Sequence, residues 1–310
     1  MDAAYLFPGQ GAQYVGMGED LYRRSPAARK IFDLGNELLN FDLSALIFKG
    51  PVEELTKTIN CQTAIFTTSL ACLEALRAEH LDIQVKFSAG LSLGEYSALA
   101  AAGALSFADG LQLVRLRAEY MEEAARTNPG GMASVIGLAL PAVEEICAQS
   151  GAEVANLNCP GQIVISGSVS ALKKAETLAK AGGAKKVIPL KVSGAFHSSL
   201  MAQAAEKLAQ VLSKVDIQPP QTTVISNVTA KAESAPGEIR DNLIRQITWR
   251  VLWEDSVKFM SAGGVGDFLE IGPGKILNGL SRKINPALKV YNLETMLDVE
   301  KFREERRQCS

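Results

Sequence analysis

The hydrophobic positions of this chain alternate between short strand-like runs and longer helix-like stretches. Apolar runs typical of buried strands occur at Ala3–Phe7, Val85–Ala89, Thr223–Asn227 and Val265–Ile271. Helix-like stretches separate them. Ser25-Pro26 marks a helix start, because serine caps helices and proline favours their first position, and Leu93–Ala102 is helix-like. This alternation predicts an α/β domain with a doubly wound, mostly parallel sheet.

One internal segment has a different order of elements. Its strand-like runs are Gly131–Leu138, Glu153–Asn158, Gln162–Ser168 and Lys185–Val192, and its helix-like runs are Pro141–Gln149 and Ser170–Ala181. The order β-α-β-β-α-β is that of a ferredoxin-like unit. We therefore predict a large domain of residues 1–125 and 192–310, a small subdomain of residues 126–191 inserted in it, and a cleft between the two.

Composition and charge narrow the class of protein. The 310 residues are 47% hydrophobic and 21% charged, as in ordinary globular proteins. The formal net charge is −2 and no long basic block occurs, which argues against nucleic-acid binding. No apolar run reaches the roughly 18 residues of a membrane span, and no signal peptide is evident. The five cysteines lack CxxC spacing, so we expect buried free thiols in a cytoplasmic protein.

The segment Gly90-Leu91-Ser92-Leu93-Gly94 is the one GxSxG motif of the chain. It follows a predicted strand and opens a predicted helix, which is the context of a nucleophile elbow. Small glycines permit the tight turn, and the helix N-terminus favours a developing oxyanion, with the N–H of Leu93 as one donor. The alternative is a serine that only caps the helix.

A nucleophilic serine needs a base, and the chain has two histidines. His80 follows Leu76-Arg77-Ala78-Glu79, where an exposed helix end is expected. His197 follows a predicted strand and the flexible Ser193-Gly194-Ala195, which places it on a loop at one end of the sheet, where α/β active sites form. His197 is the better candidate for the base, although its sequence context alone fits a structural histidine equally well.

Two arginines lie on the predicted helix Ser106–Ala125. Arg115 has Glu119 four residues on, which predicts a solvated ion pair. Arg117 has only apolar neighbours and Tyr120 at helical spacing, so its guanidinium either reaches solvent or awaits an anion. The residues alone favour the first interpretation.

The chain resembles the malonyl-CoA:acyl carrier protein transacylases over nearly its whole length. The matching segments are Leu6–Gln13 (LFPGQGAQ), Gly90–Leu99 (GLSLGEYSAL), Gly194–Met201 (GAFHSSLM) and Phe268–Leu280 (FLEIGPGKILNGL). The fold implied is an α/β-hydrolase-like core with an inserted ferredoxin-like subdomain, in agreement with the order of elements above.

The resemblance also implies the roles of particular residues. Ser92 would be acylated and His197 would activate it, in a dyad whose histidine is oriented by the main-chain carbonyl of Leu252. The N–H groups of Gln10 and Leu93 would hold the oxyanion, and Arg117 would bind the malonyl carboxylate.

Phe196, immediately before His197, would crowd the α-carbon where methylmalonyl carries its extra methyl group. The implied substrates are malonyl-CoA and an acyl carrier protein, with no metal and no bound cofactor. A serine esterase or thioesterase, a catalytically silent carrier-docking module, a methylmalonyl-specific relative and a trans-acting polyketide acyltransferase are the alternatives.

Overall fold

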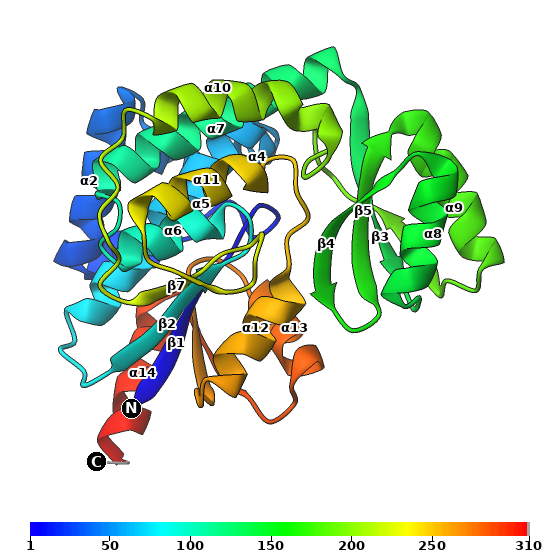
Figure 1. Cartoon of the computed structure of the whole chain (residues 1–310). Helices are drawn as coiled ribbons and strands as arrows, with labels where there is room; N and C mark the ends of the chain where they lie inside the picture. Colours follow the sequence, from blue (N-terminus) through cyan, green and yellow to red (C-terminus); the bar gives the residue numbers. More distant parts are fainter. Residues whose placement is uncertain (309–310) are drawn as a thin grey trace.

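The computed structural model describes residues 1–308, which form two lobes around two β-sheets (Figure 1). The sheet of the large lobe has the strand order β10-β9-β1-β2-β7-β8. Its strands are β1 (Asp2–Phe7), β2 (Gln84–Gly90), β7 (Thr223–Ile225), β8 (Ala232–Glu233), β9 (Asp267–Ile271) and β10 (Lys289–Leu293). All neighbouring strands are parallel except β7 and β8.

The register of the two central strands positions the turns that follow them. Phe7, the last residue of β1, pairs with Gly90, the last residue of β2. The glycine-rich turn after β1 and the Ser92 turn after β2 therefore begin side by side at the carboxyl edge of the sheet, where α/β folds form their binding sites. The N–H of Leu91 donates to the carbonyl of Phe7 at 3.1 Å, which joins the two turns.

Helices cover both faces of this sheet. They are α1 (Glu19–Arg24), α2 (Pro26–Leu39), α3 (Leu43–Lys49), α4 (Val52–Thr56), α5 (Thr58–Arg77), α6 (Gly94–Ala101), α7 (Phe107–Thr127), α10 (Ala202–Leu212), α11 (Pro236–Gln246), α12 (Trp253–Ala262), α13 (Ile276–Ile284) and α14 (Met296–Gln308), with a short 3₁₀ helix, η1 (Ser199–Met201). As predicted, Ser25 caps α2 with Pro26 at its first position. Ser106 caps α7 by accepting a hydrogen bond from the N–H of Asp109.

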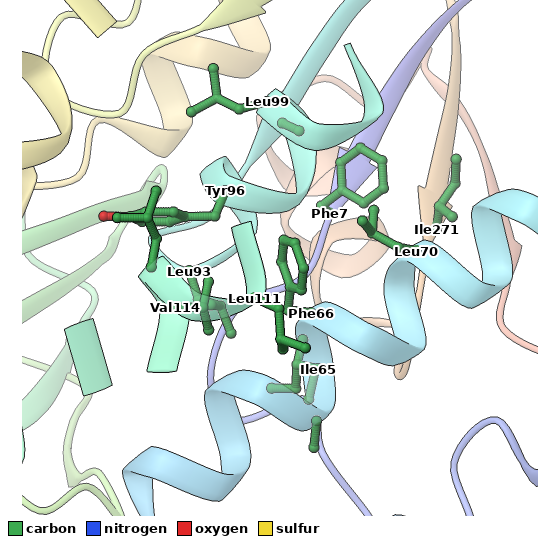
Figure 2. Close-up of a cluster of buried hydrophobic side chains, with 14 of the residues drawn as sticks. Phe7, Ile65, Phe66, Leu70, Leu93, Tyr96, Leu99, Leu111, Val114 and Ile271 are labelled. Atoms are coloured by element: carbon green, nitrogen blue, oxygen red, sulfur yellow. The ribbon is translucent and has the colours of Figure 1, made fainter. Parts of the chain in front are cut away.

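The core of the large lobe is built around α5, which is buried along almost its whole length. Figure 2 shows Phe66 and Leu70 of this helix directed at side chains from the sheet and from α7, among them Phe7, Leu111 and Ile271. Burial of each such side chain contributes about 1.5–3 kcal/mol. The packing fixes α5 against the sheet, and with it the polar side chains that α5 carries toward the carboxyl edge.

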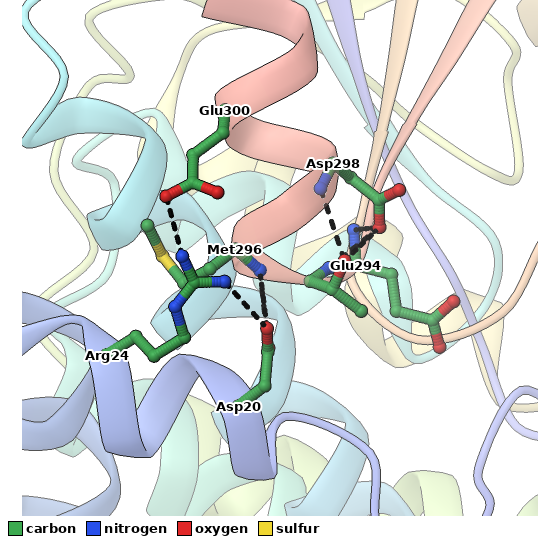
Figure 3. Close-up of polar contacts among 7 residues, drawn as sticks. Asp20, Arg24, Glu294, Met296, Asp298 and Glu300 are labelled. Carbon is green, nitrogen blue, oxygen red and sulfur yellow. Dashed lines mark hydrogen bonds and ion pairs between the residues drawn. The ribbon is translucent and has the colours of Figure 1, made fainter.

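The C-terminal helix α14 packs against α1, which lies near the other end of the sequence (Figure 3). Asp20 of α1 accepts hydrogen bonds from the N–H of Met296, the first residue of α14, at 3.1 and 3.2 Å. Arg24 pairs with Glu300 at 2.7 Å. The first contact satisfies an N–H group at a helix start, which has no partner within the helix, whereas the second is a partly exposed pair of small energetic weight.

The small lobe is an antiparallel sheet with two helices on one face (Figure 1). Its elements are β3 (Gly130–Ile136), α8 (Leu140–Ser150), β4 (Glu153–Cys159), β5 (Gln162–Ser168), α9 (Val169–Ala181) and β6 (Lys186–Pro189), in the sheet order β4-β5-β3-β6. The predicted fold class is confirmed: an α/β core with a mostly parallel sheet and an inserted ferredoxin-like unit. These elements lie within the range 126–191 proposed as the subdomain.

Four strands, β3, β6, β7 and β9, are shorter than the runs predicted from the sequence. The run Lys185–Val192 forms a strand only over Lys186–Pro189, with one further hydrogen bond to β3, from the N–H of Leu190 to the carbonyl of Met132 at 2.9 Å. The run Thr223–Asn227 ends at Ile225, and Asn227 instead lies in a turn beside Ser92. Its polar side chain is used for contacts across the carboxyl edge of the sheet.

The structure tests two further expectations from the sequence, the free cysteines and the absence of a membrane-spanning segment. Cys61, Cys72, Cys147 and Cys159 are buried and free, as predicted, while Cys309 lies outside the described residues. Within residues 1–308, no helix has the length and apolar character needed to cross a membrane.

Candidate active site

Ser92 lies at the tip of a sharp turn between β2 and α6. Its φ of 54° is in the left-handed region, which is uncommon for a residue with a side chain. The flanking glycines are required sterically. A Cβ on Gly90 would lie 1.9 Å from the carbonyl carbon of Gly94, and a Cβ on Gly94 would lie 2.1 Å from the carbonyl oxygen of Phe7. The turn thus has the strained geometry expected of a nucleophile elbow.

His197 lies against Ser92, on the loop that follows β6. Its Nε2 is 2.8 Å from Ser92 Oγ and its Nδ1 is 2.7 Å from the carbonyl oxygen of Gln246. Because a carbonyl oxygen only accepts, Nδ1 carries the proton and Nε2 is left to accept the hydroxyl proton of Ser92. His80 is exposed, in the turn after α5.

The expectation that Leu252 orients the histidine is wrong. The Leu252 carbonyl accepts the N–H and the hydroxyl of Ser256, at 3.0 and 2.9 Å, because Leu252 caps the N-terminus of α12 and its carbonyl points into that helix. Gln246 is the last residue of α11, and the last carbonyls of a helix have no partner within it. The Gln246 carbonyl is therefore free to accept from His197.

The structure also overturns the solvent-reaching interpretation of Arg117, whose side chain is only 1% exposed. Nη1 donates to Gln62 Oε1 at 2.7 Å, while Nη2 donates to Gln246 Oε1 at 3.0 Å and to Ser92 Oγ at 2.9 Å. Within residues 1–308, no carboxylate lies at ion-pair distance, and Nε has no partner. Arg117 is therefore a buried cation held by neutral amides, an arrangement suited to an anionic ligand.

Arg115, two residues before it, makes the predicted ion pair with Glu119 at 3.1 Å, near the surface. The two arginines differ in this way because α7 is amphipathic, and residues two apart point in different directions.

Burial sets the protonation of the site. Burial, and after it the positive charge of Arg117, lower the pKa of His197 from 6.5 to about 4, although the hydrogen bond to the Gln246 carbonyl opposes both effects. A histidine with this pKa is neutral at pH 7, the form in which it can take a proton.

The two expected oxyanion donors lie at the joined turns after β1 and β2. Gln10 and Leu93 both line the same cavity as Ser92. Neither main-chain N–H donates a hydrogen bond to another residue in the described part of the chain. The side chain of Gln10 is held by Gln62, whose Nε2 is 3.4 Å from Gln10 Oε1.

A cavity of about 460 Å³ lies between the two lobes and contains these groups. The large lobe contributes Ser92 and Arg117, and the small lobe contributes Met132 and Val164. Phe196 lies in the wall and is itself 4% exposed. The volume suits a small organic ligand, and the cavity occupies the position of the predicted cleft.

Three amides of this site were not identified from the sequence: Gln62, Asn227 and Gln246. A signal exists for Gln246, since the buried face of α11 consists of Ile239, Asn242, Leu243 and Gln246 at helical spacing. Two amides on the apolar face of an amphipathic helix indicate polar contacts inside the protein.

Comparison with known proteins identifies the family. Residues 4–278 match the family described as "Acyl transferase domain". The chain is 49% identical over 311 aligned positions to the malonyl CoA-acyl carrier protein transacylase of Bacillus subtilis (strain 168), covering 97% of this chain and 98% of the relative. It is 39% identical to the protein of the same name from Staphylococcus aureus (strain MW2), with the same coverage.

Solved structures agree with these matches. The acyl-carrier-protein-S-malonyltransferase of Bartonella henselae superposes with a TM-score of 0.95 at 40% identity, over 99% of this chain and 100% of that one. A malonyl-transacylase in complex with a type II PKS acyl carrier protein has a TM-score of 0.95 at 37% identity, over 98% and 100% of the two chains. The chain therefore belongs to the malonyl CoA-acyl carrier protein transacylases, within the acyl transferase family.

Proposed function

We propose that this protein transfers a malonyl group from coenzyme A to the phosphopantetheine thiol of an acyl carrier protein, through a malonyl ester on Ser92. The observation that carries the proposal is the pair of contacts to Ser92 Oγ, from His197 Nε2 at 2.8 Å and from Arg117 Nη2 at 2.9 Å. The neutral imidazole of His197 and the guanidinium of Arg117, which has no ion-pair partner within residues 1–308, thus both contact the Ser92 hydroxyl inside the cavity. The names of the relatives and the solved complex with an acyl carrier protein support the choice of both substrates.

The chemistry follows from these contacts. As Ser92 Oγ attacks the thioester carbonyl, His197 Nε2 takes its proton, and the N–H groups of Gln10 and Leu93 stabilise the oxyanion. The carbon–sulfur bond then breaks, and the coenzyme A thiolate leaves with the proton from His197. In the second half the carrier thiol gives its proton to His197 and its sulfur attacks the ester carbonyl. The bond from that carbonyl to Ser92 Oγ then breaks, His197 returns the proton to Ser92, and the carrier leaves as the malonyl thioester. The sequence of steps is ping-pong.

Arg117 supplies selectivity for a carboxylated acyl group. Acylation removes the Ser92 hydroxyl as an acceptor, which frees the Nη2 hydrogen that pointed at it. Nη1 has a second hydrogen beyond the one donated to Gln62, so the two nitrogens can donate in parallel to a carboxylate. The bonds to Gln62 and Gln246 meanwhile keep the guanidinium in place.

The partner of His197 favours transfer over hydrolysis. Esterases with a serine nucleophile place a carboxylate on the second nitrogen of the histidine, where it stabilises the imidazolium. Here that partner is the uncharged carbonyl of Gln246. We propose that a histidine oriented in this way activates a thiol more readily than water. The reaction uses a coenzyme A thioester as substrate and needs no metal or bound cofactor. It serves fatty acid synthesis in the cytoplasm.

Incubation with malonyl-CoA alone is expected to leave one malonyl ester on Ser92, because the oxyanion donors and the cavity support an acyl-enzyme. Intact mass followed by peptide mapping measures it. Ser92→Ala should take up no label and should lose transfer to the carrier protein. A label on Cys159, or transfer by a wild-type protein that never carries an ester, would contradict the proposal.

Phe196→Ser is expected to admit methylmalonyl better, because the ring lines the cavity beside His197. A difference of one methyl group corresponds to about 1–3 kcal/mol in a pocket, so the kcat/KM ratio of methylmalonyl to malonyl should rise without a complete switch. Competition between the two acyl-CoA donors measures the ratio. An unchanged ratio would place the α-carbon away from this ring.

A further inference from the structure

One residue of the site contacts all three groups that the proposed reaction uses. The main-chain carbonyl of Gln246 accepts from His197 Nδ1 at 2.7 Å, and its side-chain Oε1 accepts from Arg117 Nη2 at 3.0 Å. Its Nε2 donates to the main-chain carbonyl of Ser92 at 3.0 Å. The orientation of this amide is determined, because a guanidinium only donates and a carbonyl only accepts.

Glu95, one turn beyond Ser92, holds this amide and a second one. It is wholly buried, which raises its pKa well above the ordinary value, and its carboxyl group accepts hydrogen bonds from Gln246 Nε2 and, at 3.2 Å, from the N–H of Asn227. Asn227 in turn spans the elbow: its Oδ1 accepts from the N–H of Ser92 at 2.6 Å and its Nδ2 donates to the carbonyl of Gly90 at 2.7 Å. Both peptide groups of Ser92 are thus tied to side-chain amides that Glu95 contacts.

These contacts stabilise a strained turn. Ser92 has a φ of 54°, and a residue with a side chain persists in this region only where its surroundings over-determine it. The N–H of Ser92 donates to the side chain of Asn227, and its carbonyl accepts both from the N–H of Glu95, at 3.1 Å, and from Gln246 Nε2. Without the Asn227 acceptor the N–H of Ser92 loses its partner, and without the Gln246 donor its carbonyl keeps only the N–H of Glu95, so the turn can relax.

We propose that Gln246 is a positioning residue that sets Ser92, His197 and Arg117 in one geometry, and that Glu95 and Asn227 hold it and the Ser92 turn in place. This inference deepens the proposed function and rests on it for the role of Arg117. The positioning of Ser92 can be measured without any malonyl group.

The experiment compares two substitutions that are chemically identical. Gln246→Glu and Gln62→Glu each place a carboxylate against Arg117, because both amides accept from its guanidinium. Only Gln246→Glu also removes the side-chain donor to the Ser92 carbonyl and sets a second acidic side chain against Glu95. The probe is phenylmethylsulfonyl fluoride, which forms a sulfonate ester on Ser92 Oγ as fluoride leaves with the hydroxyl proton, and which has neither a carboxylate nor coenzyme A.

Both variants should lose malonylation. Gln246→Glu should also slow sulfonylation and acetylation by about 10-fold or more, the effect of one lost buried hydrogen bond, and at least about fivefold more than Gln62→Glu does. The saturating rate of acetylation should fall while the KM for acetyl-CoA stays near that of wild type. If the two variants lose sulfonylation equally, Gln246 acts on Arg117 alone and the inference is overturned.

A double variant keeps the test valid if Gln246→Glu does not fold. Glu95→Gln with Gln246→Glu exchanges the two side chains and preserves the pairing of an amide with a carboxyl group, but removes the side-chain donor of the Ser92 carbonyl. Its sulfonylation should remain slow, and a wild-type rate would overturn the inference. Failure of wild type to form a malonyl ester while it still reacts with the sulfonyl fluoride would count against the proposed function alone.

Discussion

His197→Ala is expected to lower malonyl transfer by at least about 10²-fold, the loss typical of removing a general base. His197 Nε2 is the acceptor 2.8 Å from the Ser92 hydroxyl, whereas Arg117 Nη2, 2.9 Å from the same oxygen, is a donor that cannot take its proton. The rate of Ser92 acylation under single-turnover conditions measures the effect directly, since it isolates the step in which the proton is removed.

His80→Ala provides the matched control. This histidine is exposed in the turn after α5, so its removal should leave acylation close to the wild-type rate. Equal losses from the two substitutions, in proteins with the same thermal stability, would show that His197 has a structural role.

The same assignment fixes the pH dependence. Burial and Arg117 lower the pKa of His197 to about 4, against an ordinary value of 6.5, so the base stays unprotonated well below neutral pH. Acylation at low substrate concentration should be flat from pH 8 to near pH 5 and fall only as the pH approaches about 4. The same lowered pKa makes the folded protein less stable in acid. Between pH 6.5 and about pH 4 the unfolded state binds a proton at His197 that the folded state excludes, so the free energy of unfolding decreases as the pH falls. A loss of half the rate near pH 6.5 would contradict the assignment.

The sequence predicted those parts of the site that depend on local geometry. A strand, a GxSxG turn and a helix suffice to place Ser92, because two glycines and a helix N-terminus determine where its oxygen points. The ferredoxin-like unit was equally predictable, since each of its strands and helices has its own periodicity. In these cases the determining residues are close together in the chain.

The errors arose where contacts join distant segments. The carbonyl that orients His197 was expected at Leu252 and lies at Gln246, six residues earlier. Either position is in the same stretch of sequence, and only the helix boundaries decide which carbonyl is free: α11 ends at Gln246, whereas α12 begins after Leu252. Boundaries are the least predictable feature of a helix, so a role that depends on one is easily misplaced.

The burial of Arg117 likewise depends on contacts from other helices, which the local sequence does not predict. Its own helix offers only apolar neighbours and Tyr120, which indicate a side chain that reaches solvent. The acceptors that hold it inside come from α5 and α11, through Gln62 and Gln246. No periodicity within α7 contains that information.

Arg117→Ala is expected to lose malonyl transfer and to gain relative activity with acetyl-CoA, because it removes the cation that a malonyl carboxylate needs and an acetyl group does not. Breaking a buried ion pair by removing one partner costs about 3–5 kcal/mol, which corresponds to a loss of about 10²-fold or more in kcat/KM for malonyl-CoA. Competition between acetyl-CoA and malonyl-CoA for Ser92 measures the change in preference.

The position of Arg117 makes this substitution act in a second way, which a matched control separates. Arg117 Nη2 also donates to Ser92 Oγ, and its charge lowers the pKa of His197. The alanine variant should therefore begin to lose acetylation at a higher pH than wild type. Arg115→Ala, two residues away, removes only a surface ion pair and should change neither preference nor pH dependence. If Arg117→Ala lowers acetyl and malonyl transfer equally, the cation supports the fold of the cavity and another residue recognises the carboxylate.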